Sequence, residues 1–192
     1  TNAPSDDTLP SVKATFTSEG ADPLPYLPAF GNILGGADVL HRIARGIGFI
    51  DPRPITGLNG GQTLLLARIG SEILPSLAME VLRVAESARE YTITASAERD
   101  WMTLDRPVGL TGIAFGTITI PVESDGSLRV NLRPVASDRL IPAWQVLDGS
   151  ADPDALSGRI VLVGLTEPSL AMVERAPLAW RLTGVAVQGQ IV

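Results

Sequence analysis

A hairpin signal at Asp125-Gly126 is the strongest local constraint in this sequence of 192 residues. Two runs of alternating apolar and polar residues flank the pair, in the segment TITIPVESDGSLRVNLR at 117–133. An Asp-Gly pair favours the tight turn that joins neighbouring antiparallel strands. We therefore predict an antiparallel hairpin here and a fold that contains β-sheet.

The clearest helical pattern lies in LPSLAMEVLRVAESARE at 74–90. Its apolar side chains recur at steps of three and four residues, which is typical of a helix with one buried face. The predicted buried face consists of Leu74, Leu77, Ala78, Val81, Leu82 and Ala85. The charged side chains on the other face are predicted to be solvated, and they are Glu80, Arg83, Glu86 and Arg89.

The rest of the chain mixes strand and helix signals. Further strands are predicted at 12–17, 63–69 and 91–96, and short helices at 36–45 and 141–149. The apolar run in GRIVLVG predicts a buried strand from Ile160 to Val163. Because strands and helices do not alternate strictly, the pattern predicts an α/β or α+β fold with a mixed central sheet, flanking helices and a β-hairpin. We expect a single domain over 1–192.

The composition argues against several classes of function. The chain has 15 Lys and Arg against 21 Asp and Glu, for a net charge of −6, whereas nucleic-acid binding usually needs a basic face. It has no cysteine and one histidine, His41, which excludes thiol catalysis and leaves too few ligands for zinc. A lone histidine without a G-x-S-x-G motif also argues against a serine hydrolase. We expect no catalytic residue, no metal site and no cofactor.

Thr166 and Glu167 are the candidate ligand-binding residues. They follow the predicted strand Ile160 to Val163, and ligands of α/β sheets gather beyond the carboxyl ends of strands. Thr166 can donate or accept a hydrogen bond, and Glu167 can bind a cationic or hydroxylated group. The segment lacks the second glycine and the lysine of a phosphate loop. The alternative is that Thr166 caps a turn and Glu167 is solvated.

Three aspartates cluster in LDGSADPDALSG at 147–158, namely Asp148, Asp152 and Asp154. Their spacing does not match the calcium-binding pattern D-x-[DN]-x-[DN]-G, and the closing Glu of that pattern is missing. We predict that these aspartates serve turns and helix caps.

Six segments, taken in order, resemble the CHASE2 domain family, an extracytoplasmic sensor module of bacterial membrane receptors. They are GIGFID (46–51), LPSLAMEVLRVA (74–85), ITIPVESDGSLRVNLRP (118–134), IPAWQVLDG (141–149), LSGRIVLVGLTEPSL (156–170) and APLAWRLTGVAVQGQIV (176–192). The resemblance covers about residues 46 to 192, and the first 45 residues match only loosely. Met172 stands where the family usually has an acidic residue, and Gly61-Gln62 replaces a basic pair common before the PSLA helix.

The resemblance implies a non-catalytic periplasmic or extracytoplasmic domain of an inner-membrane receptor. Transmembrane helices outside this chain would hold it at the membrane, because no run of about 18 apolar residues occurs within the chain. The implied output is a cytoplasmic adenylate or guanylate cyclase, a diguanylate cyclase, or a histidine or serine/threonine kinase. The implied partner is an unidentified small molecule or environmental signal. The resemblance leaves open whether the chain forms a homodimer.

Two other classes of function also stay open at this point. One is a soluble hydrolase with a carboxylate site, or a domain that binds a small molecule. The other is a structural module that holds a dimer together. A run of about 18 apolar residues beyond Val192 would favour the sensor, whereas a polar end would favour the alternatives.

Overall fold

The computed structural model describes residues 12–31, 35–50, 61–97, 108–131, 139–165, 173–175 and 181–192. The chain divides into two units. The first unit comprises residues 1–52 and 63–128, and the second comprises 53–62 and 129–192.

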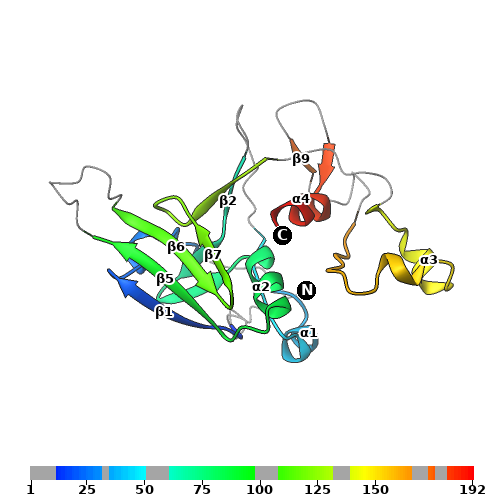
Figure 1. The fold of residues 1–192 in the computed structure, drawn as a ribbon, viewed down its shortest axis with the longest axis horizontal. Helices are drawn as coiled ribbons and strands as arrows, with labels where there is room; N and C mark the ends of the chain where they lie inside the picture. Colours follow the sequence, from blue (N-terminus) through cyan, green and yellow to red (C-terminus); the bar gives the residue numbers. More distant parts are fainter. Residues whose placement is uncertain are drawn as a thin grey trace, which may run out of the picture. The chain divides into compact units, whose positions relative to one another are not determined.

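A four-stranded sheet forms the centre of the first unit. Its strands are β1 (Thr15–Gly20), β5 (Glu90–Ser96), β6 (Gly109–Phe115) and β7 (Ile118–Pro121). Their order in the sheet is β1-β5-β6-β7 (Figure 1). β1 runs parallel to β5, whereas β5–β6 and β6–β7 are antiparallel. The sheet is therefore mixed, which confirms the predicted mixed sheet with flanking helices.

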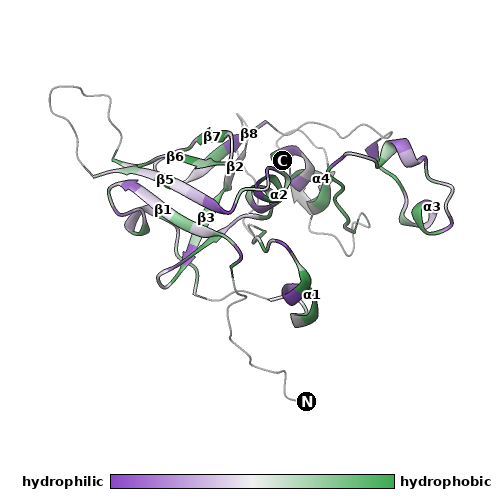
Figure 2. Ribbon diagram, turned by 60° about the horizontal axis from the view of Figure 1, so that its bottom comes forward, coloured by the Kyte–Doolittle hydropathy of each residue, from purple (hydrophilic) through white to green (hydrophobic). Residues whose placement is uncertain are grey.

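The two faces of this sheet differ in polarity, and Figure 2 gives the hydropathy of each residue along its strands. On one face the side chains of Tyr91, Ile93, Ile113 and Phe115 are buried. The Tyr91 ring stacks on Phe16 with centroids 5.3 Å apart and meets the edge of Phe115 at 5.4 Å. The other face carries the threonines Thr15, Thr17, Thr92, Thr94 and Thr119. This alternation is typical of a sheet with one face on the core and one towards solvent.

A hairpin and a helix complete the core of the first unit. β3 (Leu66–Ile69) and β4 (Glu72–Pro75) pair antiparallel across a turn. Helix α2 (Leu77–Ala85) begins directly after β4, and the Ser76 side chain caps it by accepting a hydrogen bond from the Met79 N–H at 3.4 Å. A capping serine satisfies one of the N–H groups that the first turn of a helix leaves unpaired. The predicted helix was therefore right in type but begins three residues later than Leu74.

Two shorter elements and one bridged segment lie between β1 and β2. They are η1 (Leu24–Tyr26), α1 (Asp38–Ile43) and the segment 46–50. In that segment Phe49 forms a parallel bridge with Ser76. The Phe49 N–H donates to the Pro75 carbonyl, and the Leu77 N–H donates to the Phe49 carbonyl, at 2.9 and 2.7 Å. The segment thus lies against the start of α2.

The predicted hairpin at Asp125-Gly126 was right in its turn and wrong in its pairing. The Gly126 N–H donates to the Glu123 carbonyl at 2.8 Å, and Gly126 adopts a φ of +79°, which glycine tolerates best. The two strands on either side of this turn pair with different partners. β7 pairs with β6, whereas β8 (Ser127–Val130) pairs with β2 (Gly61–Leu64) in a two-stranded sheet.

The second unit contains short elements. They are α3 (Ala143–Leu147), η3 (Pro153–Ala155), the antiparallel strands β9 (Val173–Arg175) and β10 (Arg181–Thr183), and α4 (Gly184–Ile191). The predicted helix at 141–149 is confirmed as α3, with Gly149 at a φ of +79° just past its end. No helix among the described residues is both long and apolar enough to cross a membrane.

The prediction of a buried strand from Ile160 to Val163 was wrong. These residues lie in no strand, and Ile160, Val161 and Val163 are 47%, 52% and 91% exposed. A β-carbon added to Gly164 would lie 2.6 Å from the Val185 side chain, so Gly164 lies against α4. The apolar sequence marks a tendency to be buried, but it does not supply the neighbouring strand that a buried strand requires.

Candidate functional site

Helix α2 carries two charged side chains that are buried and in contact, Glu80 and Arg83. Arg83 donates from Nε to Glu80 Oε2 at 2.8 Å and from Nη2 to Oε1 at 2.7 Å. The residues Glu80 and Arg83 are only 2% and 5% exposed. The prediction that they lie on a solvated face was therefore wrong. The buried residues of α2 are Ala78, Met79, Glu80 and Arg83, whereas Leu82 is half-buried.

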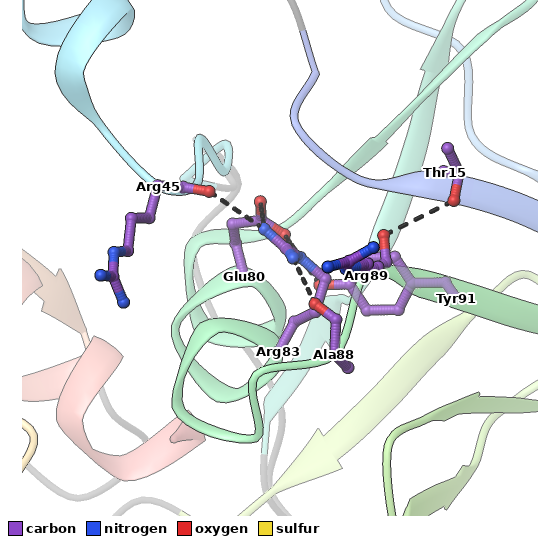
Figure 3. A network of polar contacts seen from close by, with 7 residues as sticks. All are labelled: Thr15, Arg45, Glu80, Arg83, Ala88, Arg89 and Tyr91. Carbon is purple, nitrogen blue, oxygen red and sulfur yellow. Dashed lines mark hydrogen bonds and ion pairs between the residues drawn. The ribbon is translucent and has the colours of Figure 1, made fainter.

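Three further contacts extend this ion pair into a network (Figure 3). The Tyr91 hydroxyl donates to Glu80 Oε2 at 2.9 Å. Arg83 donates from Nη1 to the Ala88 carbonyl at 2.6 Å and from Nη2 to the Arg45 carbonyl at 3.2 Å. The network therefore joins α2 to strand β5 and to the segment that precedes Phe49. We call these groups, Glu80, Arg83, Tyr91 and the carbonyls of Arg45 and Ala88, the α2 network.

The local sequence explains why the network can form. Residues three apart on a helix are neighbours on its surface, so Glu80 and Arg83 can meet. Gly46 leaves room for the carboxylate, because a β-carbon there would lie 2.5 Å from Glu80 Cγ and 2.7 Å from Oε1. Gly48 allows similar close contact, since its β-carbon would lie 2.5 Å from the Leu77 Cα and from the Ser76 carbonyl oxygen. The two glycines of GIGFID were the signal for this packing.

The electrostatics keep Arg83 and Tyr91 of the network protonated. The hydrogen bond to Glu80 raises the pKa of Arg83 above its ordinary value of 12.5, although burial opposes this shift. Burial raises the pKa of Tyr91 above its ordinary value of 10.0, and the Glu80 charge and hydrogen bond add to that effect. Arg83 therefore stays charged and the Tyr91 hydroxyl stays a donor. Both carboxylate oxygens of Glu80 already accept hydrogen bonds. The arrangement therefore suits holding α2, β5 and the segment before Phe49 together rather than transferring a proton.

The candidate ligand-binding residues, Thr166 and Glu167, lie outside the described residues. Their assignment stays a prediction. His41 is described, and its Nε2 accepts a hydrogen bond from the Gly36 N–H at 3.2 Å.

The turn and cap roles predicted for two aspartates are confirmed. Asp148 Oδ1 accepts from the N–H and the hydroxyl of Ser150 at 2.9 and 2.6 Å, and the hydroxyl contact lowers the Asp148 pKa most. Asp152 Oδ1 accepts from the Asp154 N–H at 3.0 Å at the start of η3. In the described part of the chain, no group of three or more His, Cys, Asp or Glu side chains could hold a metal ion.

Comparison with family models identifies the chain. The model of the CHASE2 domain matches residues 19–192. The chain belongs to the CHASE2 domain family. CHASE2 domains are extracytoplasmic sensor domains, so the α2 network and the sheet around it are parts of such a domain. The match begins 27 residues before Gly46 (46 − 19 = 27), so it extends further towards the N-terminus than the six sequence segments did. No curated protein and no solved structure matches this CHASE2 chain.

Proposed function

We propose that this CHASE2 chain is the periplasmic sensor domain of a bacterial inner-membrane signalling receptor. Its output would be a cytoplasmic adenylate or guanylate cyclase, or a kinase. The observation that carries this proposal is the family match over residues 19–192, because the matched family consists of extracytoplasmic sensor domains. Transmembrane helices outside this chain would connect it to the output.

The role we propose for the chain is non-catalytic. The charged groups of the α2 network support this, because Glu80 and Arg83 are buried and hydrogen-bonded to each other. Arg83 bonds Glu80, Ala88 and Arg45, and Tyr91 bonds Glu80. A catalytic base or nucleophile would need a lone pair free to meet the substrate. We expect screens for esterase, phosphatase and glycosidase turnover to be negative.

The signal that the domain would sense is a small molecule or an environmental condition. Thr166 and Glu167 are the proposed ligand contacts, on the basis of their place in the sequence and their hydrogen-bonding groups. Thermal-shift screening of a small-molecule library would find a candidate ligand. If Thr166→Val and Glu167→Gln both leave its affinity unchanged, the ligand binds elsewhere.

A chimeric receptor tests the signalling role. Residues 1–192 are placed outside the cytoplasmic membrane between two transmembrane helices, and the second helix leads to an adenylate cyclase domain. The matched control carries an unrelated folded domain in the same position. External pH, osmolarity, ionic strength and added metabolite mixtures are varied while cellular cyclic AMP is measured.

We expect at least one external condition to change cyclic AMP in the CHASE2 chimera and not in the control. In isolated membranes, both chimeras should retain cyclase activity, which separates a missing signal from an inactive output domain. Equal cyclic AMP from an active CHASE2 chimera and an active control under every condition would contradict the proposed function.

A further inference from the structure

Helix α1 buries little of its apolar surface, so the contacts at its two ends matter for its position. Its large apolar side chains, Val39, Leu40 and Ile43, are 54%, 59% and 75% exposed. Most helices of a protein are stabilised by packing of an apolar face, especially helices this short. At the end of α1 the chain is held by Arg45, whose carbonyl accepts a hydrogen bond from Arg83 at 3.2 Å.

The contact at the start of α1 is made by His41, the one histidine of the chain. Its Nε2 accepts a hydrogen bond from the Gly36 N–H at 3.2 Å. Gly36 precedes the N-cap residue Ala37, which forms no side-chain hydrogen bond with the helix. The imidazole ring therefore holds the backbone just before the helix and closes a turn over residues 36–41.

The two glycines before α1 allow the ring to lie against the backbone. A β-carbon added to Gly36 would lie 3.1 Å from His41 Nε2, and one added to Gly35 would lie 3.6 Å from Cε1. The first distance is closer than an ordinary van der Waals contact, so a side chain at position 36 would move the ring away from the N–H. The turn thus depends on glycine as well as on histidine.

The hydrogen bond between Gly36 and His41 requires a neutral ring. A backbone N–H can only donate, so Nε2 must carry no proton, and the neutral ring holds its proton on Nδ1. In a protonated histidine both ring nitrogens are donors. Protonation would therefore place the Nε2 proton against the Gly36 N–H, and the turn would lose this bond. Histidine is the side chain whose charge ordinarily changes between pH 5 and 8.

We propose that the hydrogen bond between Gly36 and His41 is a pH-sensitive latch on the turn 36–41, closed while the ring is neutral and open once the ring is protonated. The other end of α1 does not share this sensitivity, because the Arg45 carbonyl accepts from Arg83, a guanidinium that stays charged. Acid would therefore release the start of the helix while the segment 46–50 stays on α2. This inference goes beyond the proposed function and does not rest on it, since the ring titrates wherever the chain lies.

The charged residues around His41 ordinarily keep their charge in this range of pH. They are Asp38 and Arg42 in α1 and Arg45 just beyond it. Aspartate ordinarily titrates below pH 5 and arginine far above pH 8. In the described part of the chain, no charged side chain of another element bonds the His41 ring. A change in the turn between pH 5 and 8 would therefore come from His41.

Proton–nitrogen NMR of the 192-residue chain between about pH 8 and pH 5 tests the latch across the range in which histidine titrates. The Gly36 amide proton should move upfield as the pH falls, with the same midpoint as the His41 ring protons. Its exchange with water, corrected for the pH dependence of an open amide, should become about two- to tenfold faster, the factor that one ordinary hydrogen bond implies. The Leu77 amide, which donates to the Phe49 carbonyl, should not titrate with His41.

His41→Leu and His41→Gln are the control variants, because neither new side chain titrates. Both keep the N-terminal amine, which titrates near pH 8, so they also control for that group. In both variants the Gly36 amide shift should be independent of pH between 5 and 8. A wild-type Gly36 amide that does not follow the His41 ring, or the same titration in either folded variant, would overturn the proposal. A Leu77 amide that titrates with His41 would contradict the fixed second end of α1.

Discussion

Arg83 and Glu80 form a two-point ion pair within a single turn of α2, with side chains only 7% and 3% exposed. A buried ion pair is stable only if both partners are present and their remaining hydrogen-bonding groups are satisfied. In this chain Tyr91 and two backbone carbonyls satisfy them. Removal of one member should therefore affect stability more than the loss of a surface charge would.

Glu80→Ala should lower the free energy of unfolding by about 3–5 kcal/mol, because it leaves the Arg83 guanidinium buried without its counter-ion. Urea unfolding followed by circular dichroism measures the change. Glu72→Ala is the control, since Glu72 is an exposed residue of β4, and it should cost less than about 0.5 kcal/mol. Equal, small losses in both variants would contradict the buried network.

The raised pKa of Tyr91 predicts a specific alkaline titration. While the chain is folded, the Tyr91 phenol should stay protonated well above its ordinary pKa of 10.0. Below pH 10 both the folded and the unfolded chain hold this proton, so the contribution to stability is constant. Above pH 10 only the unfolded chain loses it, so stability should fall as pH rises.

Absorbance of tyrosinate against pH, with Tyr91→Phe as the comparison, measures this titration. The wild type and the variant should give the same curve until the chain unfolds. A reversible difference of one tyrosine near pH 10 in folded protein would contradict the account. Tyr91→Phe should also cost about 1.5–3 kcal/mol, the contribution of a hydrogen bond to a charged group.

Gly46 and Gly48 should not tolerate a side chain. In Gly48→Ala the new β-carbon would meet backbone atoms of Ser76 and Leu77, and overpacking of this kind typically costs about 1–3 kcal/mol. Gly31→Ala is the control, because nothing lies within 4 Å of its added β-carbon. Thermal unfolding of the two variants measures the difference. A Gly48→Ala chain as stable as Gly31→Ala would show that the segment 46–50 is not packed on α2.

The apolar run at 160–163 gives a direct test of where the core lies. Ile93→Ala should cost about 2–5 kcal/mol, because Ile93 is fully buried in β5. Val163→Ala should cost less than about 0.5 kcal/mol, because Val163 is 91% exposed. Denaturant unfolding of both variants decides between the structure and the sequence-based expectation. A loss above about 2 kcal/mol for Val163→Ala would favour the buried strand.

Local signals in the sequence predicted local structure well. The strand at 91–96, the helix now seen as α2 and the turn at Gly126 depend on neighbouring residues, and all three are present. The pairing of β8 with β2 joins residues more than sixty positions apart, and no local pattern encodes it. Glu80 and Arg83 were placed on the wrong face because helical periodicity counts apolar residues. Periodicity cannot show that the Tyr91 hydroxyl will hydrogen-bond to Glu80 and that the Arg45 carbonyl will hydrogen-bond to Arg83.

The site was less predictable than the fold. The glycines at 46 and 48 could have indicated a close approach to the helix, since a residue without a side chain is common where backbones pack tightly. Which charged side chain packs against Gly46 depends on tertiary contacts, and local sequence patterns do not reveal those contacts. The family, by contrast, was readable from six ordered segments, and the match over 19–192 confirms it.

The central claim is that this chain lies outside the cytoplasmic membrane, and cysteine labelling in intact cells tests it most directly. Thr119 is exposed on β7 and the 192 residues contain no cysteine, so Thr119→Cys provides one defined label in a full-length protein whose other cysteines are removed. Cells with a permeabilised outer membrane are treated with a maleimide that cannot cross the inner membrane. The account predicts that Thr119→Cys is labelled in intact cells to the same extent as after lysis. Labelling only after lysis would place the domain in the cytoplasm and contradict the account.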